Sequence, residues 1–184
     1  MNKDVMPIAT IKTKTMASSI DYVLHTYRKF KEENSSSLYP WANRFICGFP
    51  IPDFQRQIVW TLPQMEAFIM SVWIKNPIGT YMINDNVEIG DHVDGAFPLY
   101  CDALLDGQQR LTALQYYFDN KISIKGTDGK RYVWSDLSIV TQRRFRNTSF
   151  GREFVSVKDL YVLKELYNLR NFTGVAHQEH ERAV

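Results

Sequence analysis

The stretch LLDGQQRLTALQYYF, residues 104–118, changes its hydrophobic pattern at a single point. A short apolar run ends at Asp106 and Gly107, and beyond it apolar residues recur at helical spacing. Gly107 can adopt the positive φ that a tight turn between the two patterns needs. The stretch therefore predicts a strand, a turn and a helix in direct succession, which requires a fold that combines sheet and helix.

The rest of the chain alternates between the same two patterns. The clearest element is TLPQMEAFIMSVWIKN, where Thr61 and Gln64 form a predicted capping box. Ser18 or Ser19 is the expected N-cap of an earlier helix, and the triple serine 35–37 that follows it predicts a flexible loop. Helices are expected within residues 18–34, 61–76, 108–118, 135–147 and 159–172, and strands within 44–47, 80–85, 99–105, 121–124, 131–134 and 152–158. These short, interleaved elements predict a compact domain of the α/β or α+β class.

The composition indicates a single globular domain. The 184 residues are 45% hydrophobic and 23% charged, which suits a chain that buries one sizeable core. No apolar stretch approaches the roughly 20 residues that cross a bilayer, and the N-terminus lacks the apolar run of a secretory signal. Cys47 and Cys101 are too few for a disulfide framework and predict core positions. We therefore expect a cytoplasmic protein without a membrane partner.

Positive charge is concentrated near the C-terminus. Residues 142–171 contain seven cations and three acids. A local excess of this kind can contact a polyanion, although a solvated helix face explains it equally well. We therefore expect that any DNA contact involves Arg143, Arg144, Arg146 and Arg170.

The polar residues DGQQR suit an anion site at the start of a helix. The first N–H groups of a helix have no partner within it, and with the helix dipole they attract anions. Arg110 offers a planar fork for phosphate, while Gln108 and Gln109 could read a ligand or orient a water. Asp106 would repel phosphate, so it is better suited to hold Mg²⁺, to fix Arg110 or to activate a hydroxyl. The simpler interpretation is a turn at Asp106 and Gly107, with Asp106 as a helix cap.

The motif LLDGQQRLTAL resembles the signature of GmrSD-type restriction endonuclease N-terminal domains, a family grouped with the ParB/sulfiredoxin fold. The upstream segment IPDFQRQIVWTLPQMEAFIMSVWIKNPIGTYMI resembles the Gln-Arg pair, tryptophan, helix and Pro-Ile-Gly of that family, and LYNLRNFTGVAHQEHERA echoes a later segment. The resemblance covers residues 44 to about 120. It implies a compact α+β domain over residues 44–184, with a small mixed sheet flanked by helices, after an N-terminal helical extension over residues 1–43.

The resemblance also implies an activity. The domain would bind and hydrolyse a nucleoside triphosphate with Mg²⁺ and couple this to cleavage, or control of cleavage, of modified or foreign DNA. ATP, GTP or CTP and Mg²⁺ are the implied cofactors, and DNA and a nuclease or modification protein are the implied partners. Catalysis would depend on Asp106, Gln109 and Arg110, with Asp106 as the metal ligand. The nucleotide would contact Gln55, Arg56, Gly79, Gly107, Gln108, Arg110 and Thr112.

Two other functions fit the same motif. A kinase would transfer the phosphate to a hydroxyl, such as one on a hydroxymethylated DNA base, with Asp106 as general base. A non-enzymatic module would bind nucleotide or DNA without turnover and regulate a partner. Phosphate released into solution, phosphate attached to an acceptor, and binding without turnover distinguish the three.

Three further features have both a functional and a structural interpretation. Trp60 could stack on a base, but a tryptophan directly before a helix more often packs on the core. His177 and His180 could bind a metal, but a charged C-terminal tail is the commoner explanation. The acidic residues 84–98 predict a mobile loop that could gate a site.

Overall fold

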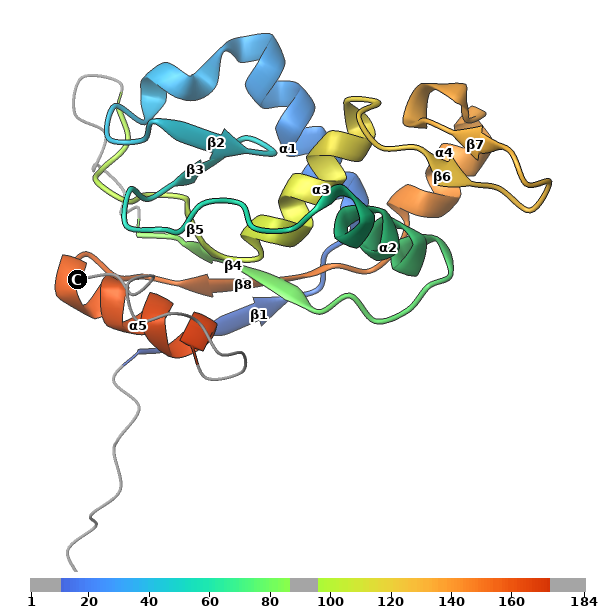
Figure 1. Ribbon diagram of the computed structural model, residues 1–184. Coiled ribbons are helices and arrows are strands. Elements are labelled where there is room, and N and C mark those ends of the chain that lie inside the picture. Colours follow the sequence, from blue (N-terminus) through green and yellow to red (C-terminus); the bar gives the residue numbers. More distant parts are fainter. Residues whose placement is uncertain (1–10, 87–95, 173–184) are drawn as a thin grey trace, which may run out of the picture.

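A four-stranded mixed sheet lies at the centre of the fold (Figure 1). The computed structural model describes residues 11–86 and 96–172. In spatial order, the strands are β1 (Lys14–Met16), β8 (Gly151–Val155), β4 (Thr80–Asn84) and β5 (Ala103–Asp106). The central strands β8 and β4 run parallel, and each pairs antiparallel with its outer neighbour. This arrangement confirms the expected α+β class with a small mixed sheet.

Helices cover both faces of the sheet. Figure 1 shows α1, α2 and α3 on one side and α5 on the other. The helices are α1 (Ile20–Glu33), α2 (Leu62–Trp73), α3 (Gln108–Phe118), α4 (Ile139–Arg146) and α5 (Leu160–Phe172). Two hairpins complete these elements: β2 (Arg44–Ile46) with β3 (Phe49–Ile51), and β6 (Ile124–Lys125) with β7 (Arg131–Tyr132).

Side chains of the central strands alternate between two hydrophobic cores, as the two-residue period of a strand requires. Tyr81 and Ile83 of β4 belong to the larger core with α1, α2 and α3, whereas Met82 between them packs in the smaller core beside α5. Leu104 and Leu105 of β5 separate in the same way. The sheet is therefore buried on both faces, and α5 has a core of its own.

The first helix packs as its sequence predicts. Its apolar stripe, Ile20, Val23, Leu24 and Tyr27, is buried in the larger core. Strand β1, which precedes α1, is paired with β8. Among the described residues, β1 and α1 of the expected N-terminal extension thus pack on the same sheet and core as the segments that follow residue 43.

Helix α2 confirms the clearest sequence prediction. Thr61 is its N-cap, and the Thr61 N–H donates to Oε1 of Gln64 at 2.8 Å, as in a capping box. Just before this cap, the ring of Trp60 packs against that of Phe68, with 5.7 Å between the ring centroids. The start of α2 is thus well fixed, and so is the chain that leads into it.

The structure corrects two local predictions and adds one strand that the sequence did not predict. The segment Ser35–Leu38 forms a 3₁₀ helix where the serines predict a flexible loop. Strand β1 carries no sequence signal, because its three residues are all exposed and show no alternation. Strand β5 begins at Ala103 rather than Leu99, because Tyr100 and Asp102 have positive φ values of 58° and 54°, which lie outside the β region.

Some predictions fall on residues that the structure does not describe. His177 and His180 lie beyond residue 172, and residues 87–95 make up most of the acidic segment 84–98. The metal site considered at the two histidines and the mobile loop expected in the acidic segment therefore stay predictions. Among the helices within residues 11–86 and 96–172, none is long and apolar enough to cross a bilayer.

Candidate functional site

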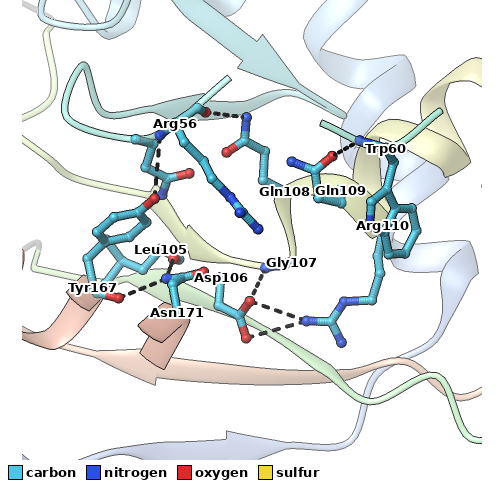
Figure 2. Close-up of a pocket in the computed structure, with 11 residues that line it drawn as sticks. Arg56, Trp60, Leu105, Asp106, Gly107, Gln108, Gln109, Arg110, Tyr167 and Asn171 are labelled. Carbon is cyan, nitrogen blue, oxygen red and sulfur yellow. Dashed lines mark hydrogen bonds and ion pairs between the residues drawn. The ribbon is translucent and has the colours of Figure 1, made fainter. Parts of the chain in front are cut away.

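A pocket of about 180 Å³ opens where β5 ends and α3 begins (Figure 2). Three segments build it: the β5–α3 turn, the chain that leads into α2, and one face of α5. Its lining residues are Gln55, Arg56, Trp60, Leu105, Asp106, Gly107, Gln108, Gln109, Arg110, Tyr167 and Asn171. The DGQQR motif thus lies at a cavity, next to the Gln-Arg pair that precedes it by about fifty residues.

The turn at the edge of this pocket depends on Gly107. Its φ of 96° lies in the left-handed region, and a Cβ atom there would come within 2.6 Å of Cβ of Tyr81. The Gly107 N–H donates to Oδ1 of Asp106 at 2.6 Å. The Leu111 N–H donates to the Gly107 carbonyl at 2.9 Å, so α3 begins here and the N–H groups of residues 108–110 have no carbonyl partner within it. This is the end of a helix at which anions bind well.

Asp106 lies between two guanidinium groups. Nη2 of Arg110 is 3.3 Å from Oδ2 of Asp106, and Nη2 of Arg170 is 3.9 Å from the same oxygen. The Asp106 side chain is 26% exposed, so it remains accessible to a ligand. One expected role of Asp106, to fix Arg110, is therefore present in this structure.

Arg110 is held on its other side by the chain that precedes β4. Its Nη1 donates to the Ile78 carbonyl at 3.1 Å. Gly79 has a φ of 76°, and a Cβ atom there would lie only 2.6 Å from Nη1 of Arg110. Gly79, which is not among the described residues that line the pocket, thus makes room for the Arg110 guanidinium. Its connection with the site runs through Arg110 rather than through a direct ligand contact.

Gln109 binds the backbone of the segment before α2. Its Oε1 accepts the N–H groups of Val59 and Trp60, each at 3.1 Å, and its Nε2 donates to the Gln57 carbonyl at 3.4 Å. The residue is 8% exposed. Because both ends of this amide are engaged, the expected role of Gln109 in orienting a water does not fit this conformation. Gln109 instead fixes the segment that carries Arg56 and Trp60, which form one wall of the pocket.

Three of the predicted nucleotide contacts also have partners within the protein. Nε2 of Gln108 donates to the Arg56 carbonyl at 3.0 Å, and Nε2 of Gln55 donates to the Leu104 carbonyl. The Thr112 hydroxyl donates to the Gln108 carbonyl at 2.8 Å, one turn back in α3. Thr112 is buried and is not among the lining residues within the described chain, so the structure does not support a direct contact between Thr112 and a ligand.

Arg56 and Trp60 form the wall opposite the turn. Figure 2 shows the Arg56 side chain extending into the pocket toward Gly107. Trp60 lines the pocket and also packs against the larger core. The structure thus confirms the expected core contact of Trp60 and shows that its ring forms one side of the cavity as well.

Helix α5 supplies the third wall. Its residues Tyr167 and Asn171 were not predicted from the sequence as site residues. The Tyr167 hydroxyl accepts the Arg56 N–H at 3.4 Å, and Nδ2 of Asn171 donates to the Leu105 carbonyl at 3.4 Å. Tyr167, Arg170 and Asn171 are three and four positions apart, so they share one helix face. The available signal was the segment LYNLRN, which echoes the family but does not show which of its residues face the pocket.

The comparison with known families agrees with the motif. The family described as "GmrSD restriction endonuclease, N-terminal domain" matches residues 28–181. The chain belongs to this family. The chain is also 30% identical to "Uncharacterized protein MJ0686" of Methanocaldococcus jannaschii over 146 residues, which are 72% of this chain and 24% of that protein. The GmrSD-family chain therefore spans about a quarter of the length of that relative. The comparison with solved structures gives no significant match.

The four arginines considered for DNA do not form one surface of this GmrSD N-terminal domain. Figure 1 shows α4, which carries three of them, well apart from α5, which carries Arg170. On α4, Arg143 and Arg144 are exposed, whereas Arg146 lies 3.2 Å from Oδ1 of Asp21 in an ion pair. Arg170 instead lies 3.9 Å from the lining residue Asp106, although it is not among the described lining residues itself, so the expected patch divides into an α4 surface and a residue at the edge of the pocket.

A metal ion at this GmrSD-family pocket would depend on few protein ligands. No group of three or more His, Cys, Asp or Glu side chains lies together within residues 11–86 and 96–172. Mg²⁺ commonly uses one or two carboxylates, phosphate oxygens and waters rather than a complete protein cage. Asp106, which is partly exposed at the pocket, fits this donor set as a single carboxylate ligand.

Proposed function

We propose that this pocket binds the phosphates of a nucleoside triphosphate and that the domain hydrolyses it with Mg²⁺. The observation that carries the proposal is the convergence of Arg56, Arg110 and Arg170, from three distant segments, on the N-terminus of α3. Guanidinium groups and N-terminal helix N–H groups are the donors that proteins most often use for phosphate. The mixed α+β sheet also fits the ParB/sulfiredoxin-like fold that the sequence resemblance implies.

The size of the pocket favours the phosphates over the whole nucleotide. Sites that enclose a small molecule usually measure about 300–1,000 Å³. A volume of about 180 Å³ is smaller than that range. We propose that the pocket holds the triphosphate chain, while the base and sugar extend along the outer surface near Trp60.

The charges at the pocket suit a ligand that arrives with a metal ion. Arg56 and Arg110 line the pocket and Arg170 lies at its edge; the nearby carboxylates are Asp106 and Glu153, the partner of Arg170. The N-terminus of α3 adds a partial positive charge. Asp106 would repel a bare phosphate chain, but it would attract Mg²⁺ bound to that chain. In this proposal Asp106 holds the metal ion, and Arg56, Arg110 and Arg170 neutralise the phosphates.

The glutamines then act as positioning residues. In this proposal Gln109 and Gln108 hold the segment 56–60, which carries Arg56 and Trp60 at the pocket. An attacking water would be oriented by Asp106 or by the metal ion rather than by Gln109. This assignment keeps the hydrolysis that the sequence motif implies and changes the residue that orients the water.

We propose that nucleotide turnover controls an action on DNA. The family is one of restriction endonuclease N-terminal domains, which places the chain in a DNA restriction context. The exposed Arg143 and Arg144 on α4 are the proposed contact with the DNA backbone. In this proposal, cleavage itself is carried out by a further domain or by a partner nuclease.

A phosphate-release assay tests the proposal. The wild type is incubated with ATP, CTP, GTP or UTP and Mg²⁺, with and without DNA. Asp106→Asn and Arg110→Ala are each expected to lower the turnover rate by about 100-fold or more. Glu165→Gln serves as the control, because it removes one negative charge from an exposed position on α5.

The same assay separates the alternatives. Phosphate that appears on a DNA hydroxyl instead of in solution would replace hydrolysis with the kinase reaction. Binding without turnover of any of the four nucleotides, with or without DNA, would leave only a regulatory module. If neither binding nor turnover occurred with the wild type, the proposed function would be wrong.

A further inference from the structure

A second carboxylate lies across the sheet from Asp106. In the strand register, Asp106 of β5 is opposite Met82 of β4, and Met82 is opposite Glu153 of β8. Residues directly opposite one another in neighbouring strands project from the same face of a sheet. Met82 packs in the smaller core beneath α5, which places Glu153 on the α5 face. The register between β4 and β5 shifts next to Met82, and the position of Asp106 near the same face follows from its 3.9 Å distance to Arg170 of α5.

Arg170 of α5 connects these two carboxylates. Its Nη2 lies 2.6 Å from Oε2 of Glu153 and 3.9 Å from Oδ2 of Asp106. The second oxygen of Glu153, Oε1, accepts the Thr80 hydroxyl at 2.5 Å. The Glu153 side chain is 13% exposed and has a partner on each oxygen, so its orientation is well determined.

A carboxylate at this position is unfavourable for a phosphate site unless it has another task. Glu153 adds a negative charge one strand beyond Met82, on the face where the phosphates are proposed to bind. An arginine side chain is flexible, however, and loses side-chain entropy when it is held in one rotamer. A charge-assisted bond to a fixed carboxylate provides this restraint before a ligand arrives.

We propose that Glu153 is a positioning residue that holds the Arg170 guanidinium at the edge of the pocket, ready for the phosphates. This inference rests on the proposed function and adds to it a residue outside the DGQQR motif. Thr80 fixes Glu153, Glu153 fixes Arg170, and Arg170 faces both Asp106 and the incoming ligand. Glu153 itself contacts no ligand, so its effect on binding depends entirely on Arg170.

Nucleotide affinity in two backgrounds tests this dependence. Binding of ATP, CTP, GTP and UTP with Mg²⁺ is measured by calorimetry for the wild type, Glu153→Gln, Arg170→Ala and the double variant. Glu153→Gln keeps the acceptor for Thr80 but removes the charge that holds Arg170. It is expected to weaken binding about three- to tenfold in the wild-type background. In the Arg170→Ala background the same change is expected to leave binding unchanged or to tighten it, because only a repelling charge is removed.

A structural role would give a different result. If Glu153→Gln only loosened the sheet, it would weaken binding by the same factor in both backgrounds, and this outcome would overturn the proposal. An unchanged affinity of Glu153→Gln in the wild-type background would overturn it as well. Thermal unfolding without nucleotide and the exposed-charge variant Glu165→Gln provide the controls. Absence of binding to the wild type would instead reject the nucleotide site itself, and with it the role of Glu153.

Discussion

The guanidinium of Arg110 occupies space that is open only because residue 79 is a glycine. Gly79 has a φ of 76°, and the space that a Cβ atom would occupy lies 2.6 Å from Nη1 of Arg110. The same guanidinium donates to the Ile78 carbonyl and lies beside Asp106. A glycine that is distant in sequence from the DGQQR motif therefore determines where the arginine of that motif lies.

This relationship predicts the effect of Gly79→Ala. The substitution strains the backbone by about 1–2 kcal/mol and displaces the Arg110 guanidinium. We expect a corresponding loss in the free energy of unfolding and a nucleotide affinity that falls about tenfold. Gly129→Ala is the matched control, because Gly129 has a similar φ of 81° and a Cβ atom there would approach only Cε of Lys125, at 3.9 Å. An equal loss of affinity in both variants would contradict the assigned role of Gly79.

Gln109 gives a second prediction. Gln109→Ala removes the acceptor of the Val59 and Trp60 N–H groups and should lower the free energy of unfolding by about 1–3 kcal/mol, measured by urea denaturation. The isosteric Gln109→Glu keeps an acceptor for both N–H groups, but it loses the donor to the Gln57 carbonyl and buries a negative charge, so it should also be destabilised. Nucleotide affinity should fall together with the free energy of unfolding, because the segment that carries Arg56 becomes less well fixed. A variant that unfolds like the wild type but has lost turnover would instead restore a water-orienting role for Gln109.

Asp102 provides a prediction on pH, outside the pocket. Burial raises the pKa of the Asp102 carboxyl above its ordinary value of 3.8, with a further contribution from Asp85, although the Tyr39 hydroxyl donates to Oδ2 at 2.7 Å. With a raised native pKa, the folded state binds the proton more tightly, so the stability contribution of Asp102 falls as the pH rises from 3.8 through the native pKa. Above the native pKa, the loss of stability caused by Asp102 no longer changes with pH.

The variant Asp102→Asn removes this charge and keeps an acceptor for Tyr39. Asparagine also tolerates the positive φ of 54° at this position. We expect the urea midpoint of the variant to exceed that of the wild type at about pH 7, and the difference to shrink as the pH approaches 3.8. A gain that is the same at both pH values would mean that the carboxylate charge is not its cause.

The arginines of α4 are expected to act differently from one another. Arg143→Ala and Arg144→Ala should each weaken DNA binding and reduce the salt slope of log K by about 0.9 for each phosphate that the variant no longer neutralises. Arg146→Ala should leave DNA affinity unchanged and cost about 0–1 kcal/mol of stability, because Arg146 is paired with Asp21. Binding measured by fluorescence anisotropy at several salt concentrations distinguishes them. Three equal effects on DNA affinity would contradict the assignment.

Local patterns in the sequence predict the elements better than they predict the contacts between them. The capping box at Thr61 and Gln64 and the buried stripe of α1 depend on residues within one or two helical turns, and both are present. The strand β1 depends on pairing with β8, which lies near the other end of the chain, and its exposed residues give no periodic signal. Pairing over such a distance follows from the whole fold and not from the strand itself.

The candidate site shows the same division. The turn at Asp106–Gly107 and the start of α3 could be predicted, because a strand, a glycine and a helix follow one another in the chain. The partners of Gln109 could not, since they are backbone groups of residues 57–60 that reach it only after folding. Tyr167 and Asn171 reach the pocket for a comparable reason, because the smaller core fixes α5 against the sheet.

The central claim is that the pocket at the start of α3 binds a triphosphate. Calorimetric titration of the wild type and of Arg56→Ala with Mg²⁺ and each of ATP, CTP, GTP and UTP tests it most directly. We predict that at least one nucleotide binds the wild type with one site per chain, and that Arg56→Ala weakens its affinity about tenfold or more at a temperature at which thermal unfolding shows both proteins to be folded. Absence of binding to the wild type, or equal affinity for both proteins, would contradict this claim.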